Sequence, residues 1–472
     1  MFRSMLSVTA LAVAASAPLQ AVAQDAELAK IREEIRVLRE AYESRIQTLE
    51  RRVADAEARA ARVEQAPQAA APSPATATAQ PARESAFNPA ISLILQGTAA
   101  RSSRDPDSYQ ITGFAPSGGE VTPAPRGFSL GESELIVTAN IDPYFRGQLV
   151  AALTPQNELE VEEAFFQTLA LGRGFTLKGG RFLSGIGYQN EIHQHAWDFQ
   201  DAPLAYKAFV GGRWNDDGLQ VKWLAPTELF VELGAEVGRG RAFPSTDRSR
   251  NSPGAWTAFG HVGGDIGAST AWRAGLSYLR ASPRDRAFED VDSLGNPVAQ
   301  SFSGKSAVWI ADFVLKWAPA GNSTTTNFKL QGEYFRRNEQ GSLTYDDRAQ
   351  GAPQFGAALS GDYRSRQSGW YLQGAWQFMP QWRVGYRYDR LDSGSVDNAI
   401  VAGGLGPTAG DFPLLMTAHN PTRNTIMADW NPTEFSRLRL QLASDKSRAG
   451  VTDNQALIQY IFSLGAHGAH RF

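Results

Sequence analysis

The chain has 472 residues, a formal net charge of -3 and no cysteine. Without cysteine it cannot be a disulfide-stapled secreted module or a cysteine zinc finger, and its near-neutral charge gives no sign of a nucleic-acid partner. After residue 24, no apolar run reaches the ~18 residues that a membrane-spanning helix requires.

The first residues have the pattern of an export signal. Arg3 precedes an apolar run from Met5 to about Ala17, and a group of small residues ends at Ala23. We therefore expect residues 1–23 to be a signal peptide that is removed from the mature protein. A membrane anchor is the alternative, but the run is shorter than a bilayer crossing.

Residues 24–65 are rich in charge and contain neither glycine nor proline, as in a long helix. Apolar residues recur every three or four positions, from Leu28 through Ile31, Ile35 and Leu38 onward. This spacing predicts an oligomeric coiled coil, and isoleucine at both kinds of core position favours three strands over two. A single solvated helix held by ion pairs between neighbouring turns is the alternative.

The rest of the chain divides into a linker and a long β region. Residues 66–87 are dominated by alanine and proline, which predicts an extended linker without a core. From 88 to 472 the periodicity changes to two: Trp382, Val384 and Tyr386, for example, alternate with arginine or glycine. Alternation of this kind predicts strands with one apolar and one polar face.

We expect sixteen strands in residues 88–472, joined in turn by tight turns and mostly long loops. The long loops fall near 101–126, 184–216, 239–254, 282–304, 339–365 and 394–422. An even strand number, with short turns at one end and long loops at the other, is typical of a bacterial outer-membrane barrel. A water-soluble sandwich alternates too, but it does not require this loop pattern. The sequence thus predicts an all-β transmembrane barrel of about 16 antiparallel strands, preceded by an α-helical coiled coil.

The order of these segments resembles a known family. It is similar to the trimeric Gram-negative outer-membrane porins with a periplasmic coiled coil, such as the phosphate-selective and dicarboxylate porins. The final Phe472 resembles the terminal-strand signal of outer-membrane proteins. Segments 142–145, 197–199 and 463–470 resemble proteins labelled zinc-regulated or TonB-dependent outer-membrane receptors. The resemblance implies an outer-membrane location, contact with lipid, a coiled coil in the periplasm and a homotrimer.

If the apolar side of each strand faces lipid, the other side lines the pore. The basic candidates are Lys316, Lys329, Arg383, Arg387, Arg437 and Arg439, and the acidic candidates are Glu132, Glu134, Glu232, Glu236 and Asp312. The basic residues lie on late strands and most of the acids on early strands. Opposed walls of this kind would favour polar and zwitterionic solutes. Solvated charges without a selective role are the alternative, and the pattern does not assign the side that Glu162 and Glu163 face.

The third long loop, residues 184–216, contains many aromatic residues, which ask for a packed environment. In general porins the third loop folds inward, so the resemblance implies that this loop narrows the pore. The candidate constriction residues are His193, His195, Trp197, Asp198 and Asp201.

Two of these residues are also candidate metal ligands. His193 and His195, with Glu191 and Asp198 nearby, offer the imidazole and carboxylate groups that bind zinc. Two histidines are too few for a closed site, so hydrogen bonding within the loop is the alternative. We expect no cofactor.

Residues 127–131 match the Gly-x-Ser-x-Gly motif of serine hydrolases, with Ser129 at the nucleophile position. That motif works on a turn between a strand and a helix, and here it opens an expected strand with no helix after it. Such short matches arise by chance in a chain with 44 glycines. We therefore expect no enzyme activity.

The leading hypothesis is a porin for passive diffusion of small hydrophilic solutes. One alternative is an outer-membrane receptor or channel for a metal or a metal chelate. Energised receptors carry a plug domain and about 22 strands, for which this chain has no room. The other alternative is a tether, in which the coiled coil contacts the cell wall and the barrel is its anchor.

Overall fold

The computed structural model describes residues 89–118, 121–155, 158–245 and 251–465. The expected signal peptide, coiled coil and linker lie outside these ranges, as does Phe472. Within them, no helix is both long and apolar enough to cross a membrane.

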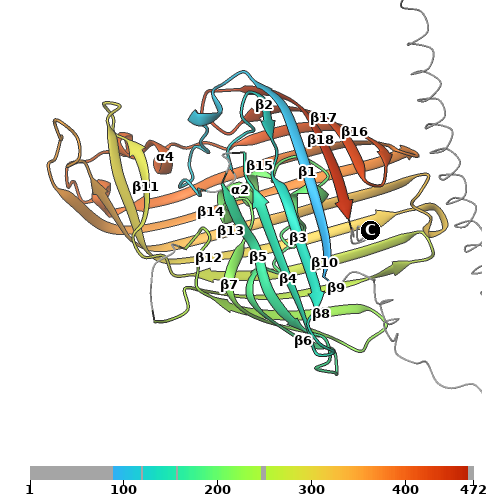
Figure 1. Cartoon of the computed structure of the whole chain (residues 1–472). Helices are drawn as coiled ribbons and strands as arrows, with labels where there is room; N and C mark the ends of the chain where they lie inside the picture. Colours follow the sequence, from blue (N-terminus) through green and yellow to red (C-terminus); the bar gives the residue numbers. More distant parts are fainter. Residues whose placement is uncertain (1–88, 119–120, 156–157, 246–250, 466–472) are drawn as a thin grey trace, which may run out of the picture. The chain divides into compact units, whose positions relative to one another are not determined.

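One antiparallel sheet closes on itself, because its first strand pairs with its last (Figure 1). Its strands are β1 (Ala90–Ser102), β2 (Gly127–Leu130), β3 (Ser133–Asn140), β4 (Phe145–Leu153), β5 (Leu159–Thr168), β6 (Phe175–Leu183), β7 (Asn215–Leu224), β8 (Phe230–Gly238), β9 (Ala255–Ile266), β10 (Thr270–Ala281), β11 (Arg286–Val291), β12 (Pro297–Trp317), β13 (Asn327–Asp346), β14 (Ala358–Met379), β15 (Trp382–Asn398), β16 (Thr422–Thr433), β17 (Ser436–Lys446) and β18 (Asp453–Gly465). Both β2 and β3 pair with β1, as two pieces of one strand, and β11 pairs only with the outer part of β12. The described barrel therefore has sixteen strands around its circumference, which confirms the predicted number.

The helical segments are all short. They are η1 (Pro106–Ser108), η2 (Gln194–Ala196), α2 (Leu204–Val210), η3 (Pro319–Gly321), α3 (Ala399–Ala402), η4 (Ala409–Asp411) and α4 (Pro413–Met416). Most of them lie in the long loops, where they do not interrupt the barrel.

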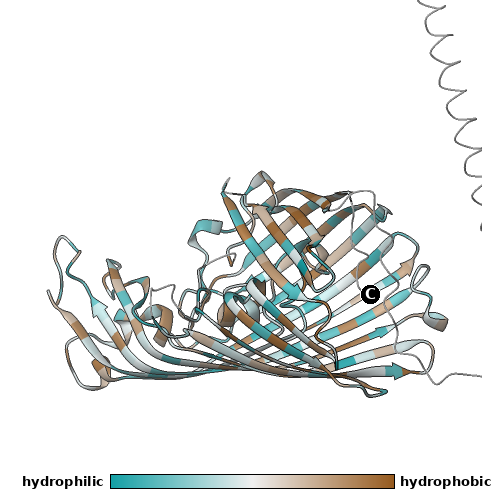
Figure 2. Ribbon diagram, turned by 60° about the horizontal axis from the view of Figure 1, so that its bottom comes forward, coloured by the Kyte–Doolittle hydropathy of each residue, from teal (hydrophilic) through white to brown (hydrophobic). Residues whose placement is uncertain are grey.

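The outside of the barrel is apolar. On β17, Leu438, Leu440 and Leu442 are about two-fifths exposed, whereas the alternate residues Arg439 and Gln441 are almost fully buried. Figure 2 shows the same alternation of hydrophobic and hydrophilic residues along many strands. Because the sheet is closed, no strand edge would leave unpaired backbone groups in hydrocarbon. The barrel therefore suits a membrane, as the sequence predicted.

Strands β12 to β15 are much longer than the rest, with 21, 20, 22 and 17 residues. A strand needs only about 9–11 residues to cross a bilayer. The excess forms a wall beyond the loop end of the barrel, visible at the left of Figure 1. A hydrophobic cluster that includes Phe302, Tyr345, Tyr363 and Phe412 supports this wall.

The sequence prediction ended these strands too early. It assigned residues 339–365 to a loop, although β13 continues to Asp346 and β14 begins at Ala358. Beyond the bilayer the outer face needs no apolar residues, and there Arg364 and Arg366 are exposed. Without a lipid-facing stripe, the segment has the composition of a loop.

The largest hydrophobic cluster lies inside the barrel. Residues 184–214, which connect β6 to β7 and are called loop 3 below, fold inward, and α2 packs on β13, β14 and β15. The cluster joins Trp197, Phe209 and Trp214 of the loop to inward residues of the strands. Loop 3 thus fills part of the lumen with a packed core.

Candidate functional site: loop 3 inside the barrel

Asp198 fastens the middle of loop 3 to two strands. Its carboxylate accepts a hydrogen bond from Arg383 of β15 at 2.5 Å and one from Lys329 of β13 at 2.9 Å. Burial alone would raise the pKa of Asp198, but these two cations hold it well below its usual range. The carboxylate is therefore ionised and remains paired at neutral pH.

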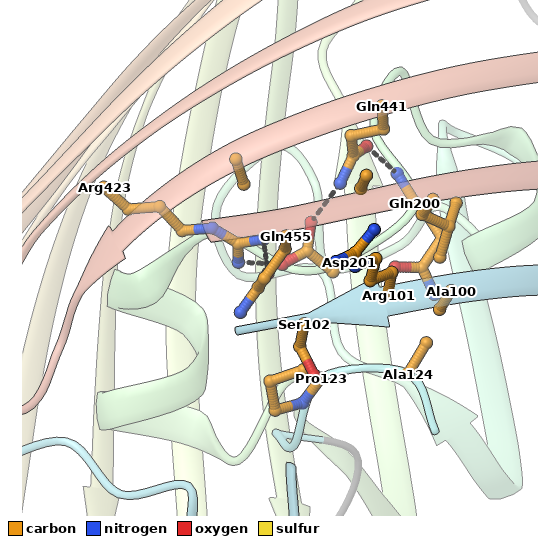
Figure 3. A pocket seen from close by; sticks show the side chains of 13 residues that line it. Ala100, Arg101, Ser102, Pro123, Ala124, Gln200, Asp201, Arg423, Gln441 and Gln455 are labelled. Carbon is orange, nitrogen blue, oxygen red and sulfur yellow. Dashed lines mark hydrogen bonds and ion pairs between the residues drawn. The ribbon is translucent and has the colours of Figure 1, made fainter. Parts of the chain in front are cut away.

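Asp201 forms a second attachment three residues later (Figure 3). Its carboxylate contacts the guanidinium groups of Arg387, at 3.1 Å, and of Arg423, and the ammonium group of Lys207 at 3.2 Å. Gln441 of β17 also donates to it, at 3.1 Å. All three cationic side chains are almost fully buried, and Asp201 compensates them together with Asp389, which pairs with Arg387, and Asp445, which pairs with Arg423.

The backbone of loop 3 provides further contacts. The carbonyl of Trp197 accepts hydrogen bonds from Arg437 at 3.3 Å and from Arg439 at 3.0 Å. The N–H of Leu204, the first residue of α2, donates to Asp389 at 2.9 Å. These bonds satisfy groups that would otherwise be unpaired inside the barrel.

The seven residues of α2 are all buried. The ring of Phe209 stacks on Phe335 at a centroid distance of 5.8 Å, and the hydroxyl of Tyr206 donates to Glu333 at 2.9 Å. A helix of this length is not stable by itself. Its conformation therefore depends on these contacts with the strands.

Carboxylates on the early part of the barrel, from β2 to β8, also bind loop 3. Glu236 accepts hydrogen bonds from the hydroxyl of Ser184 at 2.5 Å and from the N–H of Gly185 at 2.9 Å, where the loop begins. Near the end of the loop, Arg213 donates to Glu132 at 3.0 Å and to Glu162. Both ends of loop 3 are thus fixed by carboxylates of the barrel.

A β-bulge in β5 explains why the facing of this strand could not be assigned. Val150 of β4 pairs with Glu163 and Ala151 pairs with Val161, so Glu162 is an extra residue. A bulge of this kind turns consecutive side chains to the same side. Glu162 and Glu163 are both about 5% exposed and both contact loop 3, which strict alternation would forbid.

His193 lies among these carboxylates. Its Nδ1 is 3.2 Å from Glu162 and 3.4 Å from Glu134, and its Nε2 is 3.1 Å from Glu163. Burial alone would lower the pKa of His193, but its hydrogen bonds with Glu162 and Glu163 and the charge of Glu134 raise it to about 10. Without another cation at this position, the ring is an imidazolium at neutral pH.

A cavity of about 540 Å³ remains between loop 3 and the wall formed by the early strands. Its charged lining residues are Glu132, Glu158, Glu160, Glu162, Asp201, Arg213 and Arg241. Threonine, serine and glutamine side chains, among them Thr98 and Gln459, make up much of the rest. The lining is therefore polar, as a passage for water-soluble molecules requires.

The expected pore-lining residues face inward, but most of them hold the loop. Lys329, Arg383, Arg387, Arg437 and Arg439 bind loop 3, and none of them lines the large cavity. Of the acids, Glu132, Glu134 and Glu236 contact the loop. Glu232 instead pairs with His261, and Asp312 pairs with Arg273. Lys316 lies inward near the turn end of β12.

The proposed partners of the two histidines do not join them. Glu191 pairs with Lys222 at 2.6 Å, and Asp198 is committed to Lys329 and Arg383. His195 instead contacts Glu134 of β3, with Nδ1 2.9 Å from its carboxylate.

Several residues that hold loop 3 in place were not among the predicted site residues. Arg423 could have been found, because it shares the inward parity of Thr425 and Asp429 on β16. Arg213 and Lys207 lie in the loop, where side chains do not alternate between two faces as they do in a strand. The bulge in β5 conceals Glu162 and Glu163.

The serine of the hydrolase-like motif lies in a strand. Ser129 belongs to β2, and its hydroxyl is 2.6 Å from that of Thr98 on β1. The next element in the described chain is strand β3, not a helix. The turn between strand and helix that this motif needs is therefore missing here.

A scan of known protein families matches none of them. A protein of Aquifex aeolicus (strain VF5), described as an uncharacterized protein, is 30% identical over 414 residues, which cover 82% of this chain and 81% of that protein. The two chains belong to one family. That description names no activity.

Solved outer-membrane proteins have a similar fold. The channel DcaP of Acinetobacter baumannii is 12% identical, with a TM-score of 0.46, over 79% of this chain and 96% of that one. The anion-selective porin of Comamonas acidovorans is 10% identical, with a TM-score of 0.45, over 80% and 99%. These values add nothing to the strand pairing, which by itself establishes the closed barrel. The fold is a closed antiparallel barrel of sixteen strands.

Proposed function

We propose that this protein is a passive porin through which small hydrophilic solutes cross the outer membrane. The observation that carries the proposal is the polar cavity of about 540 Å³ inside a closed barrel with an apolar outer surface. A barrel that served only as an anchor would need no polar space of this size.

Loop 3 acts as the constriction in this proposal. Its ion pairs with Lys329, Arg383, Arg387 and Arg423 attach it to β13, β15 and β16. The space left to solutes is then on the opposite side, next to β1, β2 and β5. The coiled-coil pattern of residues 24–65 supports a homotrimer whose helices extend into the periplasm.

Planar-bilayer recording of the folded protein tests this function. We expect discrete conductance steps that scale with salt concentration, because a water-filled passage conducts ions. Liposome swelling in neutral sugars of increasing size then gives the size limit. Correctly inserted protein without conductance would contradict the proposal.

A further inference from the structure

Three potential ligand atoms converge where loop 3 meets β3 and β5. The Nδ1 atom of His193 is 3.2 Å from Glu162 Oε2 and 3.4 Å from Glu134 Oε2, and all three atoms lie within 4.8 Å of one another. Tetrahedral zinc, with bonds of about 2.0–2.2 Å, places neighbouring ligand atoms about 3.4 Å apart. Two of the three spacings, 3.2 and 3.4 Å, are therefore close to those around a bound metal ion.

The other nitrogen of His193 has the partner that a metal-binding histidine needs. Its Nε2 is 3.1 Å from Glu163, and Glu163 is fixed by the N–H of Leu183 at 3.0 Å and by Gln148 at 2.9 Å. Histidine ligands commonly donate their second ring N–H to a carboxylate, which orients the ring. Glu163 is placed for this role by the bulge in β5.

The second carboxylate oxygen, Oε1, of Glu162 and of Glu134 also has a partner. Glu162 Oε1 accepts a hydrogen bond from Arg213, and Glu134 Oε1 is 2.9 Å from Nδ1 of His195. The Oε2 atoms of Glu162 and Glu134 are thereby turned toward His193. The cluster has the orientation that a preformed site requires.

Glu134 gives an independent indication of a missing partner. It is completely buried, and its Oε2 atom makes no hydrogen bond within the described chain, although it lies 3.4 Å from Nδ1 of His193 in an ion pair. A buried ionised oxygen that accepts no hydrogen bond is costly. A cation bound at this position would remove that cost.

We propose that Glu134, Glu162 and His193 bind a divalent transition-metal ion of the zinc class, which fastens loop 3 to the barrel wall. One imidazole and two carboxylates suit zinc better than calcium or magnesium, which prefer oxygen ligands alone. The ion takes the place of the proton on Nδ1, and this proton passes to solvent. Because Glu162 also lines the large cavity, the ion can enter from there, and water can complete its coordination.

Calorimetric titration of the full chain, folded in detergent and stripped with a chelator, tests the site. We expect one zinc ion per barrel and a higher melting temperature in zinc. His193→Gln and the near-isosteric Glu134→Gln should each weaken zinc binding at least about 10-fold. Magnesium chloride should give no binding heat.

His419→Gln is the matched control, since that histidine lies on the 399–421 loop, where its ring nitrogen Nε2 is 2.8 Å from the carbonyl of Lys446 and its backbone N–H contacts Ser393. It should bind zinc like the unmodified protein. If a His193 variant fails to fold, X-ray absorption on the zinc-loaded protein decides, because the site predicts one nitrogen ligand with oxygen neighbours. Absence of zinc binding, or unchanged binding in Glu134→Gln, would overturn the proposal. The test is separate from conductance, so the porin function can stand if the metal site fails.

Discussion

At the scale of single residues, Asp201 is the most heavily used carboxylate of loop 3. It compensates Arg387, Arg423 and Lys207, and each of these cations is at most 3% exposed. Asp201→Asn removes the charge and keeps the shape. Because it removes a shared carboxylate from three buried cations, of which Arg387 and Arg423 keep Asp389 and Asp445, we expect it to lower the free energy of unfolding by about 3–5 kcal/mol. Urea unfolding in micelles measures the loss.

The same substitution has a pH signature. Burial would raise the pKa of Asp201, but Arg423, Arg387 and Lys207 hold it well below 3.8. A carboxylate with a depressed pKa stabilises the fold above its unfolded pKa, and this stabilisation is lost as the pH falls toward the folded pKa. The difference between the two proteins should therefore be constant near neutrality and shrink below pH ~4. A difference that grows in acid would contradict this assignment, and Asp346→Asn, which removes a solvent-screened pair with Arg348, should cost at most about 1 kcal/mol.

At the scale of elements, the position of loop 3 depends on the packing of α2. Phe209 is fully buried and stacks on Phe335. Phe209→Ala should lower the free energy of unfolding by about 3–5 kcal/mol, because it leaves a cavity in the packed core. A loosened loop should also raise the mean conductance and its noise.

Phe128→Ala is the control for this prediction, because Phe128 is 95% exposed. It should alter neither stability nor conductance. If Phe209→Ala destabilises the protein but leaves the current unchanged, loop 3 is not the constriction.

The sequence predicted the elements unequally. On β17 the leucines at 438, 440 and 442 all meet lipid, so a simple alternation was enough. On β5 the same reasoning failed, because the bulge at Glu162 shifts the parity by one residue. Loop 3 was predicted to contain the constriction residues, but its partners could not be predicted, since they come from strands up to about 240 residues away.

At the scale of the whole molecule, the closed sixteen-strand barrel was predictable from its outer surface. Lipid requires apolar residues at every second position of a strand, so the lipid-facing side can be recognised from the sequence. The role of an inward residue cannot be recognised in the same way, because an inward charge can face water or bind another element. Arg387 and Arg439 were expected to line the pore, and they point inward, but they contact loop 3 instead.

The central claim is that solutes pass beside loop 3, along the wall that carries Glu160. Because the chain has no cysteine, a single Glu160→Cys substitution gives a unique thiol in the large cavity. Val161→Cys places the thiol on the outer face, one residue along the same strand. Current through both variants is recorded before and after a bulky, charged thiol reagent is added. We predict a stepwise fall in current for Glu160→Cys and none for Val161→Cys, and an unchanged current in a Glu160→Cys variant that mass spectrometry shows to be modified would contradict the account.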